Sequence, residues 1–201
     1  MSKLKILKEN QSYTFHSYFD LPYETDDILK EFGYSFMPKK LNLPTTNKEI
    51  SRLPDVKRQI DEILPFISLS SETARRETLV SPVLLEIVRF CKCQLKIEYP
   101  LRVNERLKGT LDYLLKSNHN LLIIEAKKDD LTKGFTQLAV ELIALSEIED
   151  QDIFYGGVTI GNVWQFGKLD RIKQEIYQDL NLFKIPDDLL ELGKVLVGIL
   201  E

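Results

Sequence analysis

The middle of the sequence has the pattern of two β-strands joined by a tight turn. Residues 109–116 and 121–127 are strand-like runs, and the polar residues 117–120 between them predict a hairpin turn. Counting back equally along both strands from this turn places Asp112 directly opposite Glu125. Directly paired residues project onto the same face of a sheet, so we expect the two carboxylates to face each other.

The chemistry of this pair points to a metal ion. Two carboxylates that face each other across a hairpin repel unless a cation lies between them. Magnesium typically takes one or two protein carboxylates and fills its other positions with water and substrate phosphate oxygens. Side chains alternate along a strand, so Lys127 shares a face with Glu125. There it can orient an attacking water or stabilise charge on a phosphate.

The patterns around the hairpin predict an α/β fold, a mixed sheet flanked by helices. Helical patterns occupy residues 47–64, 71–90, 131–148 and a segment after Pro186. Strand-like patterns occupy residues 94–103, 109–116, 121–127, 153–160 and 163–169. A helix, three strands, a helix and two strands in this order are typical of an α/β core.

The length of 201 residues fits one domain. We interpret residues 1–70 as an N-terminal extension packed on the core, 71–170 as the core, and 171–201 as a C-terminal helical segment of the same domain. No apolar run approaches the roughly 20 residues that span a bilayer, and residues 1–10 lack a signal-peptide pattern. We therefore expect a cytoplasmic protein with no membrane partner.

The net charge and the positions of Cys and His argue against two classes of protein, tight nonspecific nucleic-acid binders and zinc proteins. The net charge of −4 argues against a tight nonspecific nucleic-acid binder, because phosphate binding depends on clustered Lys and Arg. Zinc is not expected, because Cys91 and Cys93 are separated in sequence from His16 and His119 without a recognisable ligand spacing. A local basic face would draw on Lys39, Lys40, Lys57, Arg58, Arg75, Arg76, Lys127, Lys128 and Lys133.

The residues of the hairpin resemble the PD-(D/E)XK nuclease superfamily. The pattern reads Gly109-Thr-Leu-Asp112, then Leu-Leu-Ile-Ile-Glu125-Ala-Lys127 on the next strand, then a helix with Gln137. The nearer resemblance is to the N-terminal nuclease domain of type I restriction R subunits and their stand-alone bacterial relatives. In these, a strand that ends in a Thr-x-Gly turn is commonly followed by Trp. The corresponding segment here is Gly157-Val-Thr159-Ile-Gly161-Asn-Val-Trp164.

The resemblance implies a restriction-endonuclease-like fold and an endonuclease that hydrolyses DNA phosphodiester bonds in restriction or mobile-element handling. Asp112 and Glu125 would bind Mg²⁺, for which Mn²⁺ can substitute, and Lys127 would assist catalysis. Related nucleases place a polar residue on the following helix, here Gln137, and many deliver a glutamate from a helix before the first core strand. Glu77 fits that role as a third metal ligand, because it lies on an otherwise apolar helical stripe.

Each of these residues also has an ordinary structural interpretation. Glu125 and Lys127 would form an ion pair on an exposed strand face, worth about 0 to 1 kcal/mol. Gln137 would be a surface glutamine, and Glu77 would point to solvent from a frayed first turn. Trp164 is more typical of core packing than of base stacking.

Two functions compete with a nuclease. The acidic charge balance favours a catalytically inactive module that binds nucleic acid or protein on the same fold, and a third possibility is a regulatory or structural α/β domain. DNA is the expected partner, and cutting of both strands would favour a homodimer. The sequence does not distinguish DNA from RNA, or duplex, branched and single-stranded substrates.

Overall fold

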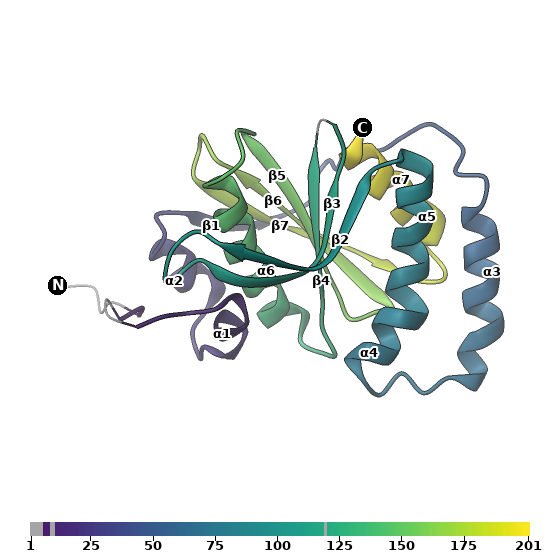
Figure 1. Cartoon of the computed structure of the whole chain (residues 1–201), viewed down its shortest axis with the longest axis horizontal. Coiled ribbons are helices and arrows are strands. Elements are labelled where there is room, and N and C mark those ends of the chain that lie inside the picture. The colour runs from purple at the N-terminus through teal and green to yellow at the C-terminus, as the bar shows by residue number, and fades with distance from the viewer. Residues whose placement is uncertain (1–5, 9–10, 119) are drawn as a thin grey trace.

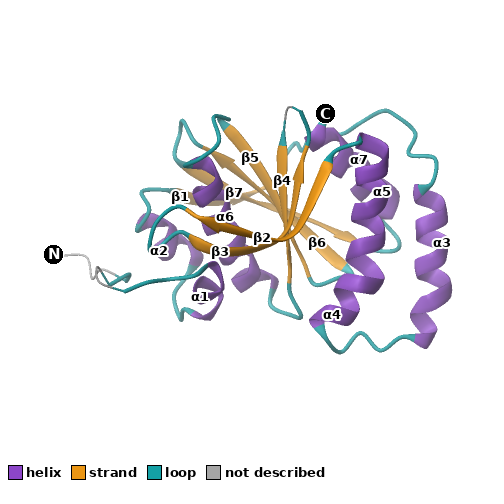
Figure 2. Cartoon of the chain, in the orientation of Figure 1, coloured by secondary structure: helices purple, strands orange, loops and turns teal. Residues whose placement is uncertain are grey.

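The predicted α/β class is confirmed by a computed structural model, which describes residues 6–8, 11–118 and 120–201. A seven-stranded mixed sheet forms the centre, and helices cover both of its faces (Figure 1 and Figure 2). His119, which belongs to the predicted hairpin turn, lies outside the described residues, as do residues 1–5 and 9–10 of the N-terminal extension. No helix in the described ranges has both the length and the apolar character to cross a membrane.

The sheet has the strand order β1-β7-β6-β5-β4-β3-β2. The strands are β1 (Ser35–Lys39), β2 (Gln94–Arg102), β3 (Lys108–Lys116), β4 (Leu121–Ala126), β5 (Ile153–Thr159), β6 (Val163–Asp170) and β7 (Glu175–Lys184). The β4–β5 and β1–β7 pairs are parallel, and the other neighbouring pairs are antiparallel. The mixed sheet therefore brings the N-terminal strand β1 beside the late strand β7.

The C-terminal segment differs from the expectation of a helical 171–201. It begins with strand β7, and its helix α7 starts only at Leu189. Strand β7 carries Gln178, Asp179 and Asn181, which weaken the apolar alternation that identifies a strand from sequence. Pairing with β6 on one side and β1 on the other determines its conformation instead.

Helices divide between the two faces of the sheet. They are α1 (Phe15–Asp20), α2 (Thr25–Lys30), α3 (Leu53–Ile63), α4 (Glu72–Arg75), α5 (Ser81–Cys91), α6 (Leu131–Ser146) and α7 (Leu189–Leu200). The cluster of buried side chains on one face includes α1, α2 and α6, and the cluster on the other includes α3, α5 and α7. Trp164 is fully buried in the second cluster, so its role is core packing.

Helix α6 is buried on every side. All residues from Gly134 to Ser146 are buried, because the sheet covers one side of the helix and α1 and α2 pack against the rest. A helix in this position is normally apolar all round. Any polar side chain on α6 therefore needs a buried partner, and this requirement places Gln137 and Glu141 in the centre of the candidate site.

The helical segment before β2 is interrupted near Pro82. A π-helical turn, η2 (Arg76–Val80), separates α4 from α5, and Pro82 lies in the first turn of α5. Proline has no N–H to donate to the carbonyl four residues earlier, and its ring crowds that carbonyl, so the preceding turn widens. This turn decides which side chain of the segment reaches the sheet.

Candidate active site

The hairpin forms in the predicted register. Lys116 pairs with Leu121 and the pairing continues as far as Tyr113 with Ile124, while the Ser117 N–H donates to the Asn120 carbonyl at 2.9 Å to close the turn. Asp112 follows at the point where the regular pairing ends. Its Oδ2 accepts a hydrogen bond from the backbone N–H of Ala126 at 2.8 Å. The side chain of Asp112 thus lies against the end of β4 that carries Glu125.

Strand β3 twists at Asp112. Leu111 packs in the cluster on the α6 face, whereas Tyr113 packs in the cluster on the α5 face, although residues two apart in a regular strand share a face. Across from Asp112, between the pairs Ile97–Tyr113 and Tyr99–Leu111, Glu98 has φ 51°, in the left-handed region. The β2–β3 pairing is therefore irregular at Asp112, where the backbone of the facing residue is strained.

Glu125 and Lys127 form a buried pair on the α6 face of the sheet. Glu125 is 1% exposed, and its Oε1 lies 2.6 Å from Nζ of Lys127. The backbone N–H of Lys127 donates to the Thr159 carbonyl of β5 at 2.7 Å, which fixes the start of its side chain. Gly134 leaves room for the lysine stem, since a Cβ there would lie 3.1 Å from Lys127 Cγ. The interpretation of this pair as an exposed surface pair is therefore wrong.

Helix α6 contributes two polar side chains to the same place. Gln137 Nε2 donates to Oε1 of Glu125 at 2.6 Å and to Oε1 of Glu141 at 2.9 Å. Gln137 is thus not a surface residue, and Glu141 is fully buried. Within the described part of the chain, Glu125 Oε2, Gln137 Oε1 and Glu141 Oε2 are buried without a hydrogen-bond partner.

Glu141 is a site residue that the sequence patterns described above do not predict. A signal for it exists, because Glu141 is the one charged residue in the run from Gly134 to Ser146. A charge inside a long apolar helical run is costly to bury unless another group compensates for it. Its position one helical turn after Gln137 would place both side chains on the same side of the helix.

Arg76 is a second residue of the site, and the sequence indicates it only as one of several basic residues of a local basic face. Its Nη1 lies 3.6 Å from Asp112 Oδ1 and 3.7 Å from Glu98 Oε1. Its Nε donates to the hydroxyl of Tyr113 at 3.2 Å. Arg76 therefore connects the helical segment before β2 to the carboxylate of Asp112.

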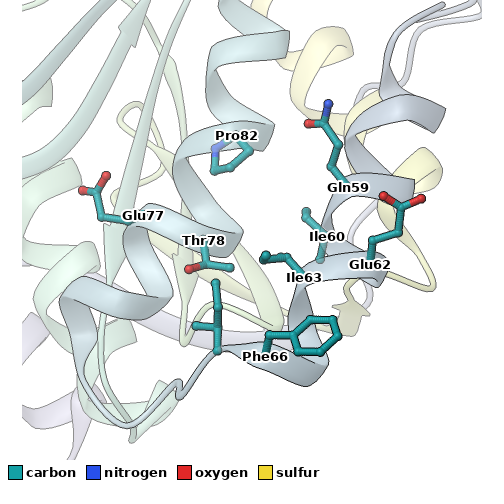
Figure 3. Close-up of a pocket in the computed structure, with 9 residues that line it drawn as sticks. Gln59, Ile60, Glu62, Ile63, Phe66, Glu77, Thr78 and Pro82 are labelled. Carbon is teal, nitrogen blue, oxygen red and sulfur yellow. The ribbon is translucent and has the colours of Figure 1, made fainter.

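Glu77, predicted as a third metal ligand, does not join the site. It is exposed, and in Figure 3 its carboxylate points away from the side chains of Ile60 and Ile63. Among the described contacts, none joins Glu77 to Asp112 or Glu125. The π-helical turn accounts for the position of Glu77, because it adds one residue to the helical repeat. Arg76, the preceding residue, therefore faces the sheet instead.

Burial and nearby negative charge disfavour ionisation of the two buried glutamates of the site, Glu125 and Glu141. Burial and, to a smaller extent, the charge on Asp112 raise the pKa of Glu125, the ammonium of Lys127 opposes both effects, and the resulting pKa is about 8. Burial and the charge on Glu125 also raise the pKa of Glu141. Burial lowers the pKa of Lys127, but Glu125 and Asp112 outweigh that effect, so the pKa rises and the side chain stays cationic.

The donor set suits magnesium in type and number. No group of three or more His, Cys, Asp or Glu side chains in the described ranges is arranged to hold a metal ion. Asp112 and Glu125 provide two carboxylates, which is within the usual number for magnesium. Oε2 of Glu125 is a buried oxygen without a donor, and the mutual repulsion of the two carboxylates would be relieved by a divalent cation.

The buried carboxyl of Glu141 makes stability depend on pH. Its raised pKa means that the folded chain holds a proton that the unfolded chain releases above about pH 4, so stability falls as pH rises toward the raised pKa. Glu141→Gln should remove part of this fall and be more stable than the wild type at pH 8. Urea unfolding at pH 5 and pH 8 measures the difference. Equal stability of the two proteins at pH 8 would contradict the prediction.

Comparison of the sequence with protein-family models and with curated proteins finds no match.

Proposed function

We propose that the chain is a metal-dependent endonuclease of the PD-(D/E)XK type, with a restriction-endonuclease-like fold, that hydrolyses DNA phosphodiester bonds in restriction or mobile-element handling. The observation that carries the proposal is the buried Glu125–Lys127 pair beside Asp112 at the end of the β3–β4 hairpin. Strong pKa shifts in a group of buried charges are more common at functional sites than in ordinary cores.

The stability cost of this arrangement supports a functional origin. Apolar side chains at positions 125, 137 and 141 would pack into the interior without buried oxygens that lack a donor. Replacement of buried ion pairs by apolar groups is often neutral or stabilising. We therefore expect Glu125, Gln137 and Glu141, which lie in the buried interface between α6 and the sheet, to serve a function.

Each residue of the site has a separate role in the proposed hydrolysis. Magnesium or manganese bound by Asp112 and Glu125 would activate water and neutralise charge on the phosphate. Lys127 stays cationic and provides a positive charge beside the reacting phosphate. Gln137 holds Oε1 of Glu125 and leaves Oε2 free of donors, while Arg76 orients Asp112 from the opposite side.

The second candidate function is a catalytically inactive binding module on the same fold, which the acidic net charge of the chain favours. The deciding experiment incubates the protein with plasmid DNA and with oligonucleotides in Mg²⁺, in Mn²⁺ and in EDTA. We expect cleavage with either metal, none in EDTA, and a loss of at least about 100-fold in Asp112→Ala. Asp152→Ala is the matched control, because Asp152 is an exposed carboxylate in a surface ion pair. Metal-independent cleavage, or wild-type rates in Asp112→Ala, would rule out this site.

A further inference from the structure

A surface beside Lys127 combines an aromatic ring with two lysines. The ring of Phe19, near the end of α1, has its centre 5.2 Å from Nζ of Lys127 and 5.9 Å from Nζ of Lys133. Lys133 is exposed in the first turn of α6, and Phe19 is half-buried. An aromatic ring that remains partly accessible thus lies next to the lysine of the candidate active site.

A second ring extends this surface outward. The ring of His16, one helical turn before Phe19, has its centre 6.1 Å from that of Phe19, and the two ring planes differ by 8°. His16 is exposed and forms an ion pair with Asp20 when protonated. The two rings are stacked with nearly parallel planes, so a base can extend the stack on the outer face of the exposed His16 ring.

On its other side, Lys133 borders a hollow of about 270 Å³ between the α1–α2 connection and the start of α6. Tyr23 lines this hollow and is 47% exposed, so its ring is available to a ligand. Glu24 and Asp130 also line it, and their oxygens can accept hydrogen bonds. Their negative charge disfavours a phosphate in the hollow, whereas a neutral ring with amino groups is compatible with it.

We propose that His16, Phe19, Tyr23 and Lys133, the aromatic lip, bind unpaired nucleobases next to a phosphate held at Lys127. This inference rests on the proposed nuclease function and defines its substrate class as single-stranded nucleic acid, or a single-stranded segment of a larger one. Aromatic rings interleaved with cations are the usual means of binding single strands, because every base has a face that can stack. In a duplex the neighbouring bases cover those faces.

The aromatic lip also explains how a chain with a negative net charge could bind a nucleic acid, which is itself negatively charged. A net charge of −4 leaves little long-range attraction for a polyanion, so affinity must come from short-range contacts. Stacking on an aromatic ring strengthens binding by about 5- to 100-fold per base and does not depend on net charge. Lys127 and Lys133 then need to hold only the phosphates next to the stacked bases.

The test measures binding separately from cleavage. Fluorescently labelled 12-nucleotide single strands and a hairpin duplex of the same composition are titrated with protein in EDTA, and binding is followed by anisotropy. Phe19→Ala and Tyr23→Ala should each weaken single-strand binding by about 5- to 100-fold and leave duplex binding unchanged. Phe66→Ala is the matched control, because Phe66 is 82% exposed beside a separate apolar groove (Figure 3). It should bind both forms as the wild type does.

Further variants separate stacking from packing. Phe19→Trp keeps an aromatic face and should retain single-strand affinity, whereas Phe19→Leu keeps apolar volume without a ring and should lose it. Thermal unfolding confirms that each variant is folded, and Phe19→Leu serves if Phe19→Ala is not. Retention of single-strand affinity by Phe19→Leu and Tyr23→Ala, an equal loss for single strands and duplex, or no binding by the wild type would overturn the aromatic lip.

Cleavage assays in Mg²⁺ show whether a negative result contradicts the aromatic lip or the proposed nuclease function. A wild type that binds single strands through Phe19 and Tyr23 but cleaves nothing would keep the aromatic lip and overturn the nuclease. A wild type that cleaves duplex DNA and is indifferent to both substitutions would keep the nuclease and overturn the lip.

Discussion

Glu125→Gln is expected to lower metal-dependent cleavage by at least about 100-fold and to remove the rise in melting temperature that magnesium gives the wild type. The amide keeps the shape of the side chain but removes the negative charge on the donor-free oxygen Oε2. A ligand that binds only the folded state stabilises it by mass action, so loss of the site removes the stabilisation.

In metal-free buffer at pH 8.5, the same variant should be at least as stable as the wild type, because Lys127 still has the charge of Asp112 nearby when Glu125 becomes a neutral amide. Burial and the charge on Asp112 raise the pKa of Glu125 to about 8, so between about pH 4 and pH 8 the folded wild type keeps a proton that the unfolded chain releases. By pH 8.5 the wild type has lost the corresponding stability, whereas an amide does not ionise. Glu149→Gln is the control, because Glu149 pairs with Lys116 on the surface. Equal magnesium shifts in wild type and Glu125→Gln would place the ion elsewhere.

Lys127→Met is expected to destabilise the chain by about 3 kcal/mol at pH 9, because removal of one partner of a buried ion pair leaves the other charge unpaired. The cation lowers the pKa of Glu125, so without it that pKa rises above about 8. At pH 6 the carboxyl is protonated in both folded proteins, and the loss should be smaller. Urea unfolding at the two pH values measures the change.

Two further variants give this prediction its controls. Lys116→Met breaks a partly exposed ion pair with Glu149 and should cost no more than about 1 kcal/mol at either pH. Adding Glu125→Gln to Lys127→Met removes the unpaired charge and should recover most of the lost stability. A pH-independent loss in Lys127→Met would indicate that packing of the lysine stem, and not its charge, is responsible.

The hairpin could be predicted because short-range rules determine it. The strand period and the length of the polar turn specify which residues pair, and that register brings Asp112 to the same end of the sheet as Glu125. Gln137 could be placed only through the resemblance, since its neighbours in the sheet come from a different part of the chain. Its hydrogen bonds to Glu125 and Glu141 depend on the burial of α6, which no local pattern specifies.

The sequence predicted the wrong side chain of the helical segment before β2 as a site residue, and the structure explains why. Projecting an ideal α-helix back from Leu84 puts Glu77 on the core side, and this projection assumes a constant number of residues per turn. The π-helical turn before Pro82 has more residues per turn than an α-helix. As a result Arg76, and not Glu77, lies beside Asp112. The proline was visible in the sequence as a point of interruption, but the one-residue change in helical repeat was not.

The enclosure of α6 by the N-terminal segment has a consequence for dissecting this protein. A fragment cut to residues 71–170, which the sequence suggests as the core, would lose α1, α2 and both strands beyond β6. Helix α6 would then lose the covering that α1 and α2 give it, and with it part of the burial that raises the pKa of Glu141. The site's electrostatics are thus a property of the whole chain, and a gene fragment encoding every predicted site residue would still not encode the site.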